Sequence, residues 1–264
     1  MILFLAGTSD ARQLAILLKE AGHSLLTTVV TDNAAIELRK AGLDVHVGRL
    51  TKEDFVDVVK EKRFQAIVDA SHPFAEEASK NALTAAKEAG ITYIRYERES
   101  QTHEGAGITV VDSYDAAADA AFEKKGTIML TTGSKTLQTF TKKLLNDPDI
   151  RLIARMLPRK DNMEKCEQLG LPQKDIVAMQ GPFTKEFNRA LYKQYQVSMM
   201  ITKESGKVGA VDEKVKAARE LGIEVVMIKR PEILYDNRYS KFADVVAHVN
   251  ELFDNKKTVT IGGR

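Results

Sequence analysis

Short apolar runs alternate with amphipathic helical stretches along almost all of this 264-residue chain, and that alternation constrains its fold most strongly. A repeated strand–helix order favours a parallel sheet covered by helices on both faces. In the first part, the apolar runs predict strands over residues 2–6, 24–30, 44–47, 65–69 and 92–96. The stretches between them predict helices over residues 10–21, 34–41, 52–62 and 74–89. Gly22, Gly42 and Gly90 each follow a helical stretch, as glycines that end helices do.

Charged and small residues interrupt this rhythm after residue 98, and the alternation resumes at residue 108. Strands are predicted over residues 108–111, 127–131, 151–154, 175–178, 197–201 and 224–228. Helices are predicted over residues 114–124, 135–143, 159–168, 184–195, 212–221 and 239–254. The predicted fold class is α/β, with two tandem Rossmann-like, doubly wound parallel-sheet domains. We place them at 1–98 and 108–254, with a junction over 99–107, a polar tail over 255–264 and the ligand cleft between the domains.

Composition argues against a nucleic-acid-binding protein and against a membrane-spanning protein. The chain has 39 basic and 37 acidic residues, no tryptophan and 6% aromatic residues, which argues against a nucleic-acid-binding protein. No apolar run approaches the ~18–20 residues of a membrane span, and the apolar start is typical of a first strand, not of a signal peptide. Cys166 is the only cysteine, so we expect a cytoplasmic protein with neither a disulfide framework nor a thiolate metal cluster.

The first predicted strand leads into a turn of small residues, LAGTSDAR, at positions 5–12. A dinucleotide fold needs small residues there, because the backbone must approach a pyrophosphate at a helix N-terminus. Gly7 meets this need, although the rest of the G-x-G-x-x-G pattern is absent. Thr8 and Ser9 can donate hydroxyl protons to phosphate, and Arg12 follows one turn into the helix. The alternative is an ordinary helix start capped by Thr8 or Ser9.

An acidic residue, Asp32, follows the second predicted strand. An acid at this position commonly receives the ribose 2′-hydroxyl and disfavours a 2′-phosphate, which favours NADH over NADPH. Asp32 is equally suited to be the N-cap of the next helix.

The stretch DASHPFA ends the fourth predicted strand and places a hydroxyl and an imidazole at its carboxyl end. Ser71 is suited to an N-cap and Pro73 to a first helical position. Glu76 and Glu77 complement the positive end of the following helix, so a neutral group such as the nicotinamide ribose suits this turn better than a pyrophosphate. His72 is a candidate general acid. No metal ligand is expected, because the turn lacks a second ligand at suitable spacing.

Strand ends in the second half are basic or bear hydroxyl groups. The turns read TTGSK at 131–135, TKESGK at 202–207 and KRP at 229–231, and Arg155 follows another predicted strand. A single such lysine usually belongs to a solvated surface. Several cations along one sheet edge favour a ligand with several carboxylates or phosphates, held by charge-assisted hydrogen bonds.

Taken together, these turns resemble the precorrin-6A reductase family of cobalamin biosynthesis, which includes the cobalt-precorrin-6A reductases. The similar stretches are residues 5–12, 69–75, 96–98, 132–135, 181–183, 202–206 and 229–231. The His-Pro turn and the TKESG turn are the most specific, whereas Ala6 departs from the double glycine often found in the family. The resemblance implies one Rossmann-like domain for a nicotinamide coenzyme and one for a tetrapyrrole, with their last strands exchanged between the sheets.

The reaction that the resemblance implies is the reduction of precorrin-6A or cobalt-precorrin-6A to the 6B form. A hydride passes from NADH or NADPH to a macrocycle carbon, and the neighbouring atom is protonated by His72, water or a substrate carboxyl. The implied partners are the many-carboxylate tetrapyrrole and, for product hand-over, the next enzyme of the pathway. The residues implied for the coenzyme are Gly7, Thr8, Ser9, Arg12, Ser71, His72 and Pro73. Those implied for the tetrapyrrole are Arg98, Lys135, Arg155, Lys203, Ser205, Gly206 and Arg230.

Two other functions compete with this one. The first is a dehydrogenase of a smaller anionic substrate, which could engage only one or two of the cations. The second is a non-catalytic, coenzyme-sensing module, which would need no substrate-binding second half.

Overall fold

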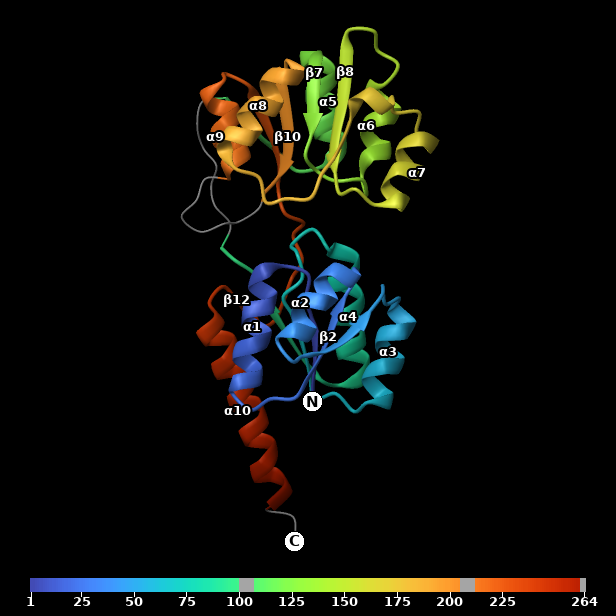
Figure 1. Ribbon diagram of the computed structural model, residues 1–264. Helices are drawn as coiled ribbons and strands as arrows, with labels where there is room; N and C mark the ends of the chain where they lie inside the picture. Colours follow the sequence, from blue (N-terminus) through green and yellow to red (C-terminus); the bar gives the residue numbers. More distant parts are fainter. Residues whose placement is uncertain (100–106, 205–211, 262–264) are drawn as a thin grey trace. The chain divides into compact units, whose positions relative to one another are not determined.

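The computed structural model describes residues 1–99, 107–204 and 212–261, with side chains described up to residue 255. The chain forms two compact units (Figure 1). Unit 1 comprises Met1–Glu99 and Pro231–Arg264, and unit 2 comprises Ser100–Arg230.

Unit 1 is built on a parallel six-stranded sheet in the order β12-β5-β4-β1-β2-β3. Its strands are β1 (Ile2–Leu5), β2 (Leu25–Val29), β3 (Asp44–Val47), β4 (Ala66–Asp69), β5 (Thr92–Tyr96) and β12 (Arg238–Tyr239). Its helices are α1 (Ser9–Glu20), α2 (Asp32–Lys40), α3 (Lys52–Glu61), α4 (Glu76–Ala89) and α10 (Phe242–Ile261). This is the strand order of dinucleotide-binding folds, with the topological switch point between β1 and β4.

Helices cover both faces of this sheet, so its central strands are buried and, except for Asp69 at the end of β4, apolar. Every residue of β1 and β4 is buried. On one face, Phe4 packs in a core with residues of α1, α2 and α10, including Leu14 and Val249. On the other face, Leu3 packs in a core with residues of α3 and α4, including Phe55. Figure 1 shows α1 and α10 together on one side and α3 and α4 on the other.

Unit 2 repeats this winding in a parallel sheet ordered β6-β11-β10-β7-β8-β9. Its strands are β6 (Ile108–Val111), β7 (Gly126–Leu130), β8 (Ile150–Met156), β9 (Ile176–Ala178), β10 (Met199–Lys203) and β11 (Glu224–Ile228). Its helices are α5 (Tyr114–Lys124), α6 (Leu137–Leu144), α7 (Lys160–Gln168), α8 (Lys185–Tyr195) and α9 (Glu213–Glu220), with a 3₁₀ turn at Gln173–Asp175. The switch point lies between β7 and β10.

These sheets confirm the predicted fold class of two doubly wound, Rossmann-like domains. The predicted strands and helices occur close to their expected bounds. The exchange of last strands implied by the family resemblance is also present in unit 1. There, the sixth strand is β12, which the chain supplies only after it has passed through unit 2.

The predicted boundary of the second domain is wrong at its C-terminal end. Residues 231–254 were expected in the second domain, but they fold with unit 1. The reason is β12, whose pairing with β5 includes a hydrogen bond from the Arg95 N–H to the Asn237 carbonyl (2.8 Å). The predicted helix over 239–254 begins instead at Phe242 and continues to Ile261, through most of the expected polar tail.

Candidate functional site

The switch point of unit 1 brings together the two turns that sequence analysis singled out in the first half. One turn follows β1 and the other follows β4, and these strands are neighbours in the sheet. In open α/β sheets, ligands bind outside the carboxyl ends of the strands at such a point.

The turn after β1 has room for a ligand above its backbone. Gly7 has φ +140°, which side-chain-bearing residues rarely adopt, and a Cβ built on it would meet no atom within 4 Å. Thr8 caps α1, because its Oγ1 accepts a hydrogen bond from the Ala11 N–H (3.1 Å). The predicted alternative of a Thr8 cap is therefore confirmed, and Ser9 becomes the first helical residue. The Thr8 hydroxyl proton remains suited to a phosphate, whereas Ser9 Oγ donates to Asp10 Oδ1 (3.5 Å).

Asp32 is not the N-cap of α2. Thr31 takes that position, since its Oγ1 accepts from the Ala34 N–H (3.3 Å), and Asp32 lies exposed in the first turn of α2. Because β2 pairs with β1, the Asp32 turn neighbours the Gly7 turn at the sheet edge. Arg12 forms an exposed ion pair with Glu37 of α2 (3.1 Å).

The His-Pro turn differs from its predicted form. The helix α4 begins at Glu76 with Ala75 at the N-cap, so Ser71 is not the cap and Pro73 is not the first helical residue. The chain turns first, with the Ala75 N–H donating to the His72 carbonyl (2.7 Å). The Phe74 N–H donates to His72 Nδ1 (3.2 Å), so a neutral imidazole carries its proton on Nε2.

Ser71 caps no helix because α4 begins only at Glu76, and a buried carboxylate holds its backbone instead. The fully buried Asp69 accepts hydrogen bonds from the Ser71 N–H (2.9 Å), Ser79 Oγ (2.6 Å) and Tyr93 Oη (2.6 Å). Its Oδ1 also lies 2.9 Å from Nη1 of Arg95, which is equally buried. One carboxylate thus joins the turn, α4 and β5.

Burial by itself would raise the pKa of Asp69. The charge of Arg95 and the hydrogen bonds from Ser71, Ser79 and Tyr93 outweigh it, so the pKa of Asp69 lies below its usual value. Asp69 is therefore ionised at neutral pH, and its charge is compensated inside the protein.

Lys203, the last residue of β10, lies at the switch point of unit 2, near the cations Lys135 and Lys214. Its Nζ lies 5.6 Å from the centre of the Tyr114 ring. Burial, together with the charges of Lys135 and Lys214, lowers the pKa of Lys203 to about 8. Lys135 follows β7, the neighbouring strand, and α6 after it has no acidic residue in its first turn.

Arg155 is a second buried cation of unit 2. It lies in β8, next to β7; its Nη1 donates to Asn188 Oδ1 (2.7 Å), and its guanidinium lies 4.6 Å from the centre of the Phe183 ring. Burial lowers the pKa of Arg155, yet an arginine stays charged at neutral pH.

The two other predicted tetrapyrrole residues that the structure describes, Arg98 and Arg230, are each paired with a carboxylate. Arg98 belongs to unit 1, where it forms an ion pair with Asp10. Arg230 is buried against Glu204, with Nε and Oε1 3.3 Å apart. Ser205 and Gly206 lie outside the described residues. Sequence analysis missed Lys214 of α9, which is paired with Asp212 (2.9 Å); a lysine in a first helical turn gives no signal of its own.

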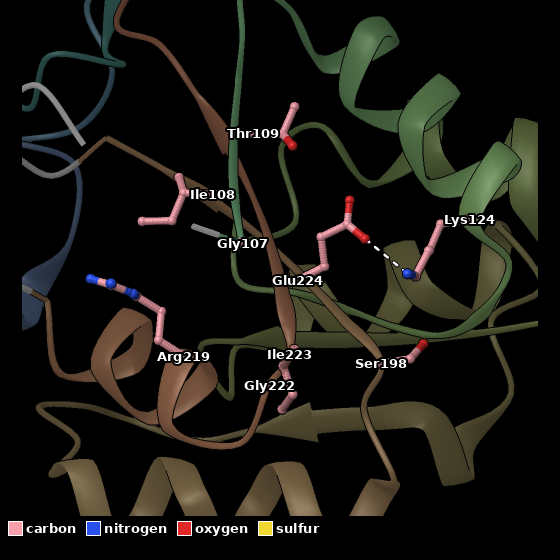
Figure 2. A pocket seen from close by; sticks show the side chains of 9 residues that line it. All are labelled: Gly107, Ile108, Thr109, Lys124, Ser198, Arg219, Gly222, Ile223 and Glu224. Atoms are coloured by element: carbon pink, nitrogen blue, oxygen red, sulfur yellow. Dashed lines mark ion pairs between the residues drawn. The ribbon is translucent and has the colours of Figure 1, made fainter. Parts of the chain in front are cut away.

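A cavity of about 420 Å³ in unit 2 lies away from this switch point (Figure 2). It is lined at the amino-terminal ends of strands by Ile108 of β6, Ser198 before β10 and Glu224 of β11. Figure 2 shows the ion pair between Glu224 and Lys124 at its side (3.0 Å). Ligand sites of this fold lie at the opposite, carboxyl edge.

The described residues contain neither a metal-binding cluster of His, Cys, Asp and Glu residues nor a membrane-spanning helix. Within 1–99, 107–204 and 212–261, no group of three or more His, Cys, Asp and Glu residues could hold a metal ion. In these same ranges, no helix has the length and apolar character needed to cross a membrane. Cys166 is buried, with Sγ 3.5 Å from Met156 Sδ.

Comparison with known proteins gives concordant matches. The family model described as Precorrin-6x reductase CbiJ/CobK matches residues 1–250. A cobalt-precorrin-6A reductase of Priestia megaterium is 66% identical over 95% of this chain and 99% of its own length. A cobalt-precorrin-6A reductase of Methanothermobacter thermautotrophicus is 35% identical over 96% of this chain and 82% of its own length.

A solved structure, CobK precorrin-6A reductase, has a TM-score of 0.76 to this chain. The alignment covers 95% of this chain and 96% of that chain at 24% identity, and it shows a shared fold.

The buried contacts of Asp69 predict that substitutions in unit 1 lower its stability by graded amounts. Arg95→Met leaves the Asp69 charge uncompensated and should cost about 3–5 kcal/mol. Tyr93→Phe removes one hydrogen bond to that charge and should cost about 1.5–3 kcal/mol. Lys80→Ala breaks an exposed ion pair with Glu76 and should cost at most about 0.5 kcal/mol. Hydrogen exchange of β1 amides in urea measures the three values, and equal losses would contradict the network.

Proposed function

This chain belongs to the precorrin-6x reductase family, oxidoreductases of a tetrapyrrole intermediate, and on that premise we propose that it reduces cobalt-precorrin-6A to the 6B form with NADH. The cobalt-containing substrate follows the names of the relatives at 66% and 35% identity. A cytoplasmic location and a hand-over of the product to the next pathway enzyme belong to the same proposal.

The switch point of unit 1 fits a nicotinamide coenzyme. The open space above Gly7 lets a pyrophosphate approach the backbone, and the N-terminus of α1 with Thr8 and Ser9 offers donors to it. Arg12 can leave its exposed pair with Glu37 for a phosphate at small cost. The exposed carboxylate of Asp32 is suited to accept from a ribose 2′-hydroxyl and to repel a 2′-phosphate, which supports NADH.

The His-Pro turn is assigned to the nicotinamide end of the coenzyme. Glu76 and Glu77 in the first turn of α4 oppose a phosphate there, whereas Ser71, His72 and Pro73 can orient a neutral group. The coenzyme, when bound, supplies the hydride for a macrocycle carbon. We assign the proton for the neighbouring atom to His72, whose exposed ring carries it on Nε2.

The switch point of unit 2 is assigned to the tetrapyrrole. The observation that carries this assignment is the desolvated Lys203, whose ammonium is further disfavoured by two neighbouring cations. Such mutual repulsion is relieved when a ligand brings several carboxylates. Lys135, Lys203, Lys214 and Arg155 form this cationic group. Arg98 is left out of it because it pairs with Asp10 in unit 1, and Arg230 because it is buried against Glu204. Lys214 is included, although it pairs with Asp212, because its charge acts directly on Lys203.

Turnover tests the reaction directly. Under anaerobic conditions with cobalt-precorrin-6A, NADH should give a product heavier by two hydrogens in mass spectrometry, and NADPH should react more slowly. Asp32→Ala should narrow the difference between the coenzymes, because it removes the carboxylate that repels a 2′-phosphate. The absence of a reduced product with both coenzymes and with both the cobalt and metal-free substrates would refute the reductase proposal.

The lowered pKa of Lys203 predicts a pH dependence of tetrapyrrole binding. The ammonium is protonated below about pH 8 and neutral above it, so KM for the tetrapyrrole should rise as the pH increases through 8. Lys203→Arg should remove this rise, because arginine stays charged. Lys203→Ala should raise KM at pH 7 about 10- to 100-fold and leave the Kd of NADH unchanged. Equal effects on both ligands would contradict the assignment.

His72→Asn tests the proton donor, since its side-chain oxygen can still accept from the Phe74 N–H. We expect kcat to fall about 10²- to 10⁴-fold while the Kd of NADH stays within threefold of wild type. An unchanged kcat would instead assign the proton to water or a substrate carboxyl.

A further inference from the structure

Both turns at the switch point of unit 1 are held by side chains from one place, the end of β5. We propose that Arg95 and Arg98 are positioning residues for coenzyme binding, Arg95 acting through Asp69 on the His-Pro turn and Arg98 acting through Asp10 on the Gly7 turn. This inference rests on the proposed assignment of the coenzyme to unit 1. It moves Arg98 from the tetrapyrrole, where sequence analysis placed it, to the coenzyme.

The buried contacts among Arg95, Asp69, Ser71 and Ser79, here called the Arg95 arm, hold the His-Pro turn at both of its ends. Asp69 holds the backbone N–H of Ser71 at the start of the turn and the hydroxyl of Ser79 in α4 after it. Arg95 Nη1 pairs with the same carboxylate and also lies 3.4 Å from Ser71 Oγ. The four side chains are all buried, so the turn is tied to the interior at two points.

Additional groups hold Arg95 itself in place. Its guanidinium lies 5.6 Å from the centre of the Tyr235 ring, and that ring stacks on Tyr93 at 5.9 Å between centres. Glu97 lies 3.8 Å from Arg95 Nε and 3.4 Å from Nε of Arg238 in β12. Apolar residues of similar volume often give equal or greater stability than a buried ion pair, so stability alone does not explain this arrangement.

The ion pair of Arg98 with Asp10, here called the Arg98 arm, lies at the N-terminus of α1, which is assigned to the pyrophosphate. Asp10 lies in the first turn of α1, directly after Ser9, and its carboxylate would repel a phosphate there. Arg98 Nε pairs with Asp10 Oδ2, with both side chains about four-fifths buried (23% and 18% exposed). The pair therefore neutralises the charge that opposes the ligand and fixes the first turn of α1.

The experiment is a charge-rescue cycle on the full-length protein. Titration calorimetry measures the Kd of NADH and, anaerobically, of cobalt-precorrin-6A for wild type, Arg98→Ala, Asp10→Asn and the double variant. Lys19→Ala is the matched control, because it removes one positive charge at the other end of α1. Circular dichroism and thermal unfolding report on the fold.

Arg98→Ala should weaken NADH binding about 10- to 100-fold, because Asp10 is left uncompensated. The double variant should recover to within about fivefold of wild type, since both charges are then absent. Tetrapyrrole Kd should stay the same in every variant, and Lys19→Ala should match wild type. An unchanged NADH Kd in Arg98→Ala, a loss of tetrapyrrole binding instead, or no recovery in the double variant would overturn the Arg98 arm.

The Arg95 arm is tested in parallel with Asp69→Asn, which cannot accept from Ser71, Ser79 and Tyr93 at once. NADH Kd should rise about tenfold with an unchanged tetrapyrrole Kd. Ser79→Ala keeps the buried charge and releases only α4, so it should give a smaller rise in a folded protein even where Asp69→Asn does not fold. A lower melting temperature with an unchanged NADH Kd in Ser79→Ala would show that the Arg95 arm only stabilises the fold and does not position the turn for the coenzyme. Wild type that binds neither NADH nor NADPH would instead refute the proposed function itself.

Discussion

The reversal of strand order beside one central strand is the constraint on which the rest of this structure depends. In unit 1 the chain winds outward from β1 in one direction through β2 and β3, and in the other through β4, β5 and β12. In unit 2 it winds outward from β7 through β8 and β9 and, in the other direction, through β10 and β11, while the edge strand β6 precedes β7 in the sequence. The helices that leave the two innermost strands must pass to opposite faces, so the turns before them diverge and leave room for a ligand. The sheets predict where ligands would bind, and the turns predict the chemistry of those ligands.

The two switch points differ in charge in a way that matches two different ligands. In unit 1, acids lie in the first turns of α1, α2 and α4, and the acid nearest the Gly7 turn is neutralised by Arg98. In unit 2, the first turn of α6 is free of acids, that of α9 contains Glu213, and Lys203 is desolvated beside two other cations. A ligand with two phosphates and neutral ends suits the first arrangement, and a ligand with many carboxylates suits the second.

The sequence predicted elements whose signal is local. Apolar runs and helical periodicity located the strands and their helices, and turn composition singled out several strand ends, some of which lie at the two switch points. The apolar pattern did not predict β12, because two residues form no apolar run. The return of the chain to unit 1 was implied only by the family resemblance, and the predicted domain bounds did not include it. Sequence analysis also misplaced Ser71 as a cap, because the chain turns between His72 and Ala75 before α4 begins at Glu76. Ser71 instead contacts Asp69 and Arg95, and Arg95 is distant from it in sequence. The ion pairs of Arg98 with Asp10 and of Arg230 with Glu204 were not predicted either, because these partners are also distant in sequence.

The central claim is that each switch point takes its own ligand. Hydrogen–deuterium exchange with NADH alone and with cobalt-precorrin-6A alone, under anaerobic conditions, tests it most directly. NADH should slow exchange at residues 6–9 and 70–75 of unit 1, and the tetrapyrrole should slow exchange at residues 131–135 and at the end of β10 in unit 2. Protection of the unit 2 turns by NADH, or of the unit 1 turns by the tetrapyrrole, would contradict the account.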